Sequence, residues 1–111
     1  MISMGTVGVE ALDEPALVKA LKALGDTTRF RMMQEIADAG ELSCGQVAAL
    51  FDISQPTISH HLKILTDAGI LVTRNQGKHH YTSVNRPLLA ELGLSLRARL
   101  APGGRAQPRR S

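Results

Sequence analysis

The sequence contains few of the residues that mark several large protein classes. Among its 111 residues there is one cysteine, Cys44, there is no tryptophan, and aromatic residues make up 3%. A single cysteine excludes an internal disulfide and a cysteine-rich zinc cluster. The sequence also has no apolar run of membrane length and no cationic segment followed by an apolar signal core, so we expect a cytoplasmic protein. A core of Leu, Ile, Val, Ala and Met favours helices over a β-sandwich.

Acidic residues are scarce in the second half of the chain. Residues 53–111 contain nine basic and two acidic residues, a net charge of +7, whereas residues 1–52 contain four basic and eight acidic residues, a net charge of −4. This polarity is typical of a protein that turns one half toward a polyanion. A basic tail that only aids solubility is the alternative, because residues 105–111 supply three of the nine basic side chains.

Residues 54–69 are the most informative stretch, and they predict one helix with defined ends. The hydroxyl of Ser54 can cap the first turn, Pro56 falls where its missing N–H costs little, and Gly69 follows the last turn. A narrow apolar stripe recurs at helical spacing and is expected to be buried: Ile58, Leu62 and Leu65.

The face opposite this stripe is small, polar and cationic. It carries Ser59, His60 and Lys63, and no acidic residue of this helix precedes Asp67. Short hydrogen-bonding side chains over an anchored stripe suit a helix that enters a DNA major groove end-first. An ordinary amphipathic surface helix is an equally good interpretation of this stretch taken alone.

Three earlier helices are predicted over about residues 13–24, 26–38 and 43–51. The expected buried stripe of the second helix is Phe30, Met33, Ile36 and Ala37. The third helix opens with a capping box and is separated from the helix at 54–69 by only a few residues. This pair predicts a helix-turn-helix in which the second helix is the reader.

The apolar pattern changes from helical spacing to alternation after Gly69. Two β-rich runs, residues 70–76 and 79–84, flank a turn at Gly77 and predict a hairpin with a polar, basic tip. A last helix from about Pro87 carries more leucine than a small core can bury, which indicates an interface.

The predicted fold is therefore mainly α with a small β-hairpin. It is a winged helix-turn-helix of about five helices and a two-stranded wing. Residues 1–11 are predicted to be flexible, residues 12–100 to form the DNA-binding and dimerisation domain, and residues 101–111 to be a disordered basic tail.

Five segments match the motifs of one known family in the same order. They are Leu24–Arg31, which is similar to the motif "LADPTRLRIL", then Glu41–Ala48, Ser54–Leu62, Ala68–Leu71 and Arg74–Tyr81. Over about residues 17–92 the chain thus resembles the ArsR/SmtB family of bacterial winged-helix repressors. The resemblance implies a homodimer built from the first and last helices. It also implies repression by operator binding, released when an effector binds.

Two sets of site residues follow from these patterns. The predicted DNA-contacting set is Ser54, Gln55, Pro56, Thr57, Ser59, His60, Lys63, Arg74, Gln76, Lys78 and His79. The predicted dimerisation set is Leu17, Leu21, Leu88, Leu89, Leu92 and Leu96. Within the first set, Lys63, Arg74 and Lys78 are expected mainly at phosphates.

The two familiar metal sites of the family lack their ligands in this chain. The pattern "ELCVCDL" has thiolates where this sequence has Ser43 and Gly45, and the last helix offers only Glu91, with no His or Asp. We therefore predict no metal site and no cofactor, and we expect an effector that is unidentified.

The sequence also allows functions other than a repressor with an unidentified effector to be compared: a metal- or redox-responsive repressor, a protein-interaction module and an enzyme. A metal- or redox-responsive repressor that uses His79, His80 or Cys44 stays open. A winged helix that serves only protein interaction is a more distant alternative, because the exposed helix face and the hairpin tip lack acidic residues. We do not expect an enzyme, since no nucleophile–base pair, phosphate loop or carboxylate dyad occurs at a meaningful spacing. The expected partners are double-stranded operator DNA and a second copy of the chain, with no membrane.

Overall fold

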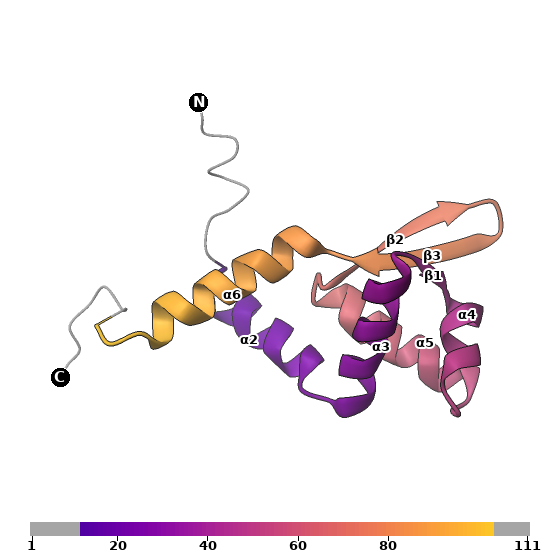
Figure 1. Ribbon diagram of the computed structural model, residues 1–111, viewed down its shortest axis with the longest axis horizontal. Coiled ribbons are helices and arrows are strands. Elements are labelled where there is room, and N and C mark those ends of the chain that lie inside the picture. Colours follow the sequence, from indigo (N-terminus) through magenta and orange to yellow (C-terminus); the bar gives the residue numbers. More distant parts are fainter. Residues whose placement is uncertain (1–11, 104–111) are drawn as a thin grey trace.

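The computed structural model describes residues 12–103, which form five helices and a three-stranded antiparallel sheet (Figure 1). The predictions of a flexible N-terminus, residues 1–11, and of a disordered tail, residues 101–111, fall on residues outside this range, apart from residues 101–103. The elements in chain order are α2 (Glu14–Leu24), α3 (Thr27–Ala39), β1 (Leu42–Ser43), α4 (Cys44–Leu50), α5 (Gln55–Asp67), β2 (Leu71–Gln76), β3 (His79–Val84) and α6 (Arg86–Leu100).

Each of the five helices begins at a polar side chain that accepts a backbone N–H of the first turn. These caps, whose oxygens satisfy amides that have no partner inside the helix, are Asp13, Asp26, Ser43, Ser54 and Asn85. The predicted capping box is confirmed, because Ser43 Oγ and Gln46 Oε1 each accept the other residue's backbone N–H. Gly69 has a φ of 83°, as expected for a glycine that follows a helix.

The sheet has one strand more than predicted. The strand order is β1-β3-β2, and the added strand β1 pairs through Leu42 with Thr82 and through Ser43 with Tyr81. A strand of two residues is too short to show alternation in the sequence, and its pairing with β3 bridges about forty residues of chain. The predicted hairpin is confirmed as β2 and β3, which meet at a turn where Gly77 has a φ of 61°.

The core lies between the helices and the inner face of the sheet. Its buried apolar residues are Leu17, Ala20, Ala23, Met32, Met33, Ile36, Val47, Ile58, Leu62, Leu65, Ile70, Leu71 and Leu92. The predicted stripe of α5 is therefore confirmed. In addition, no helix within residues 12–103 is both long and apolar enough to cross a membrane.

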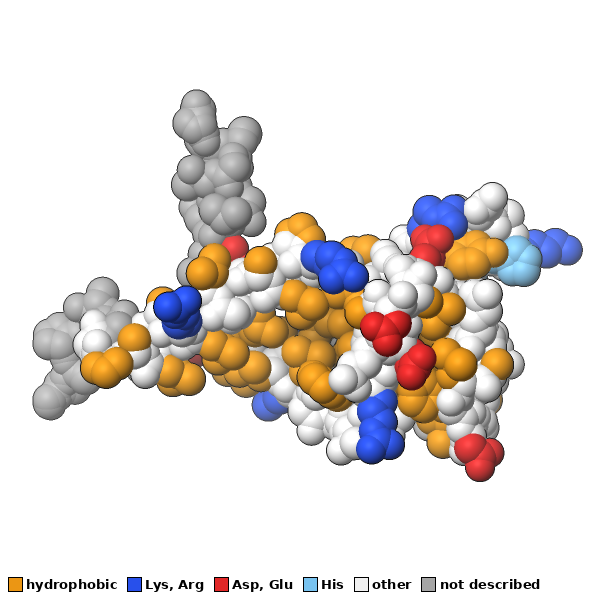
Figure 2. Space-filling view, in the orientation of Figure 1, with side chains coloured by type: hydrophobic (Ala, Val, Ile, Leu, Met, Phe, Trp, Pro, Cys, Tyr) orange, Lys and Arg blue, Asp and Glu red, His pale blue; other side chains and the backbone are white. Residues whose placement is uncertain are grey.

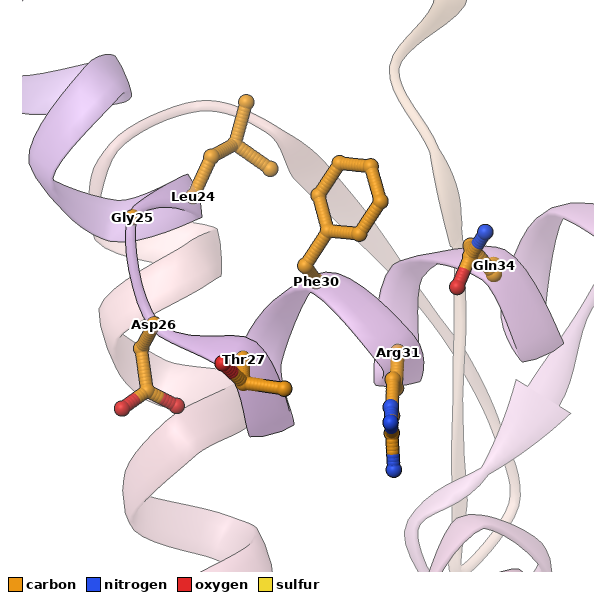
Figure 3. Close-up of a pocket in the computed structure, with 7 residues that line it drawn as sticks. All are labelled: Leu24, Gly25, Asp26, Thr27, Phe30, Arg31 and Gln34. Atoms are coloured by element: carbon orange, nitrogen blue, oxygen red, sulfur yellow. The ribbon is translucent and has the colours of Figure 1, made fainter.

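One predicted core residue of α3 is wrong. Phe30 is 50% exposed, and Met32, which the prediction left out, is fully buried. On a helical wheel Phe30 lies about 120° from Ile36, so it falls at the edge of the buried face. In Figure 3, Phe30 stands beside Leu24 above the turn between α2 and α3, while Arg31 points away from them.

Candidate nucleic-acid interface

The helix-turn-helix consists of α4 and α5, which pack against each other across the turn at residues 51–54. Burial of Ile58, Leu62 and Leu65 turns the opposite side of α5 to solvent. The side chains predicted to contact DNA from this helix and its cap are all exposed: Ser54, Gln55, Pro56, Thr57, Ser59, His60 and Lys63. We call α5 the recognition helix.

Hydrogen bonds orient three of these side chains at the cap and in the first two turns of the recognition helix. Ser54 Oγ lies 2.9 Å from Thr57 Oγ1 and also accepts the Thr57 N–H. Ser59 Oγ lies 3.4 Å from the Sγ of Cys44 at the start of α4. Polar atoms that are already oriented lose little conformational freedom when they meet base edges or phosphates.

We define the wing as β2, β3 and the turn between them. Its cation Arg74 makes several contacts within the fold. The Arg74 guanidinium donates to both carboxylate oxygens of Glu41, at 2.9 and 2.8 Å, and also donates to Gln76 Oε1 at 2.7 Å. Its central carbon lies 4.9 Å from the centroid of the Tyr81 ring. Arg74 is therefore held on β2, toward the tip of the wing, by a two-pronged ion pair.

This ion pair reduces the net positive charge of the wing, because the Glu41 carboxylate lies against the Arg74 guanidinium. Hydrogen bonds from Arg74 lower the pKa of Glu41, and the same contact raises the pKa of Arg74. The hairpin tip has no acidic residue in its own sequence, but the fold brings a carboxylate from the segment before α4 to it. Sequence reasoning missed Glu41, because no local pattern connects it with a residue 33 positions away.

Strand alternation divides the polar residues of the wing between two faces. Arg74 pairs with Tyr81 and Gln76 pairs with His79, so these four side chains share one face. The next pair in register, Asn75 and His80, lies on the other face. A hydrogen bond joins Asn75 Oδ1 to His80 Nδ1.

The face that carries His80 is turned toward the recognition helix. An open cleft of about 320 Å³ lies between them, and its lining includes Ser59 and Lys63 from α5 and Thr73 and His80 from the sheet. His79 lies on the opposite face, where its ring centroid is 6.0 Å from that of Tyr81. Asn75 and His80 were absent from the predicted DNA-contacting set, although the alternation of residues 70–84 contained the signal.

The three residues considered for effector binding, Cys44, His79 and His80, do not all lie in one cleft. Cys44 and Asp67 line the same cleft as His80, while His79 lies outside it. Within residues 12–103 no three His, Cys, Asp or Glu side chains are grouped closely enough to hold a metal ion.

Charged and histidine side chains gather at the outer end of the wing (Figure 2), and hydrophobic side chains line the hollow between α6 and the helices α2 and α3. The helix pair, the exposed polar face of α5 and the adjoining hairpin define a winged helix-turn-helix of the DNA-binding class.

Comparison with known proteins gives the family. Residues 24–74 match a family model described as a helix-turn-helix domain. The chain is 35% identical over 72 residues to an arsenical resistance operon repressor of Staphylococcus aureus, covering 65% of this chain and 68% of that protein. It is 37% identical over 70 residues to the transcriptional repressor SdpR of Bacillus subtilis, covering 63% and 77%.

Solved structures agree with these relatives. One is a possible transcriptional regulator for arsenical resistance, which is 30% identical with a TM-score of 0.66, covering 76% of this chain and 86% of that one. An ArsR family transcriptional regulator has a TM-score of 0.70 at 22% identity, covering 81% and 92%, and shares the fold. The chain belongs to the ArsR/SmtB family of winged-helix transcriptional repressors, whose members bind DNA.

Proposed function

We propose that this repressor binds its operator as a homodimer and reads it with the first turns of α5, while the wing lies along the adjacent backbone. One observation carries the proposal: the polar face of α5 is exposed beside a basic hairpin. Gln55, Thr57, Ser59 and His60 would meet base edges or neighbouring phosphates, and Lys63 and Lys78 would meet phosphates. Such a repressor acts in the cytoplasm, where bacterial DNA lies.

Exposed leucines support the dimer. Leu21 on α2 is 37% exposed, and Leu94 and Leu100 on α6 are 57% and 77% exposed. Leu17 and Leu92, which were predicted at the interface, are 4% and 6% exposed within the single chain. A charge at Leu92 would therefore disturb the fold of each copy, and Leu94 is the better position at which to test association.

The remaining leucines of the predicted dimerisation set, Leu88, Leu89 and Leu96, are half-buried. Each already packs against the core of its own chain and still exposes part of its side chain. A second copy that covered these surfaces would extend the apolar core across the interface. We propose no catalytic role and no cofactor for this assembly. The effector that releases the operator is of unidentified chemistry.

The proposal can be tested with duplexes that the protein selects from a random-sequence pool. We expect Gln55→Ala to weaken the selected duplex by about 1–3 kcal/mol and to relax the preference at one position. Lys78→Gln should weaken all duplexes alike and reduce the slope of log affinity against log salt by about one unit. Selection of no preferred sequence, or a salt-independent affinity, would contradict the proposal.

The dimer has its own measurement. Leu94→Glu should leave helix content unchanged, shift the sedimentation coefficient to that of a monomer, and remove tight binding to the selected duplex. Gln34→Glu places the same charge on an exposed position of α3, outside the proposed interface, and serves as the control. Equal behaviour of the two variants would argue against an interface at Leu94.

A further inference from the structure

A single guanidinium connects the recognition helix with the helix proposed for dimerisation. Arg29 lies in the first turn of α3, immediately after the turn that follows α2. Its Nε donates to Ala23 O at 2.6 Å, and one Nη donates to Lys22 O at 3.4 Å. Its other Nη lies 3.3 Å from His61 Nδ1 on the recognition helix. Arg29 thus contacts three helices.

The contacts with α2 are favourable because of where that helix ends. The last carbonyls of an α-helix have no partner inside the helix, and they carry the negative end of the helix dipole. A cation placed there both satisfies the carbonyls and interacts with the dipole. Ala23 is buried, so its carbonyl has little access to water.

The contact with His61 has a defined chemistry. A guanidinium only donates hydrogen bonds, so His61 Nδ1 must accept and the ring must carry its proton on Nε2. Asp26 stands close by: its side chain accepts the backbone N–H of Arg29, and this bond, together with the charge of Arg29, lowers the pKa of Asp26. Asp26, which is the cap of α3, therefore holds the backbone of Arg29 in place.

We propose that Arg29 is a positioning residue for operator reading, an inference that rests on the proposed function. A dimer must present its two recognition helices about one helical turn of DNA apart, roughly 34 Å. In a dimer held by α2 and α6, this separation depends on the angle between α2 and α5. Arg29 fixes that angle, because it is bonded to the end of α2 and to the middle of α5 at once.

The test uses the full chain and a duplex that the wild-type protein has selected from a random pool. Spacer versions of this duplex carry insertions of about 1–5 base pairs between the half-sites, against a natural repeat of about 10 base pairs. Fluorescence anisotropy gives the affinity for each spacer, and sedimentation confirms that each variant is dimeric.

Four variants separate positioning from general stability. Arg29→Met and His61→Leu remove one partner each, and His61→Asn keeps an acceptor close to the Nδ1 position. Arg31→Met removes an exposed arginine two positions further along α3 and is the matched control.

We expect Arg29→Met and His61→Leu each to weaken the selected duplex about tenfold, because each removes a hydrogen bond to a charged group. Both should also flatten the preference for one spacing. His61→Asn should stay within about twofold of wild type, and the double variant should be no weaker than either single variant. Arg31→Met should keep the wild-type spacing profile.

Three results would overturn the inference: an unchanged spacing preference in Arg29→Met, losses that simply add in the double variant, or equal losses in His61→Asn and His61→Leu. If Arg29→Met fails to fold, the two His61 variants decide by themselves. A wild-type protein that selects no duplex would instead contradict the proposed function.

Discussion

Glu91 provides a stability prediction that does not depend on DNA. It lies on α6 beside Leu92 and one turn before Ser95, on the face that packs against the rest of the chain, and it is 5% exposed. Within residues 12–103 its Oε2 is buried without a hydrogen-bond partner. A buried polar atom that gives up water without gaining a partner costs about 1–3 kcal/mol. Glu91→Met removes this cost and keeps the length of the side chain.

We therefore expect Glu91→Met to raise the free energy of unfolding by about 1–2 kcal/mol. For a domain of this size that corresponds to a rise in Tm of about 4–16 °C, and to a urea midpoint about 0.5–1 M higher. Urea titration followed by circular dichroism measures it, at equal protein concentration because association contributes to the stability of a dimer. The m-value should not change.

Glu91→Gln is the matched control, since it keeps the shape and a polar end that still needs partners. It should gain much less stability than Glu91→Met. A Glu91→Met variant that is less stable than wild type by more than about 1 kcal/mol would refute the reasoning, because it would show that the carboxylate is paired in the folded assembly.

Three further predictions concern the wing and the effector. Because pairing lowers the pKa of Glu41, the contribution of the Glu41–Arg74 ion pair is fully present above the pKa of an unfolded glutamate, about 4.3, and is lost as the pH falls through the lower folded-state value. Carbon NMR of the Glu41 carboxyl should show this lower midpoint, and Arg74→Gln should return it to the ordinary value. His80→Ala should weaken DNA binding more than His79→Ala, because only His80 faces the recognition helix; equal losses in anisotropy titrations would contradict this. Micromolar zinc should not release the selected duplex, and Cys44→Ser should bind it as wild type does; zinc release that disappears in His80→Ala would establish a metal site in the cleft.

Local patterns were sufficient to predict most of the fold. The caps at Ser43 and Ser54, the stripe of α5 and the turn at Gly77 each depend on residues within a few positions of one another. Such interactions act in the same way in an isolated segment and in the folded chain, so sequence spacing alone reveals them.

Apart from Asn75 and His80, whose face follows from strand alternation, the missed features depend on contacts between distant segments. Strand β1 exists because Leu42 and Ser43 meet β3, and the charge of Arg74 is modified because Glu41 is brought to it. The exposure of Phe30 depends on which face of α3 meets the other helices. The relation of Arg29 to His61 spans 32 positions. Neither composition nor periodicity contains information on such pairs.

Two ion pairs at the candidate nucleic-acid interface change the DNA affinity that the net charge alone would predict. The second half of the chain has a net charge of +7, but Lys63 lies 3.2 Å from Asp67 and Arg74 lies 2.8 Å from Glu41. A phosphate that binds either cation must compete with a carboxylate that is already in contact. Replacing a carboxylate by a phosphate releases fewer counterions than a contact made by a solvated lysine. The slope of log affinity against log salt should therefore be shallower than the number of cations implies. Non-specific duplexes, which offer only phosphates, should lose most from this competition, whereas a specific operator would also gain base contacts from α5. We therefore expect the intrachain carboxylates to reduce the background of non-specific binding and to increase the ratio by which the repressor distinguishes its operator.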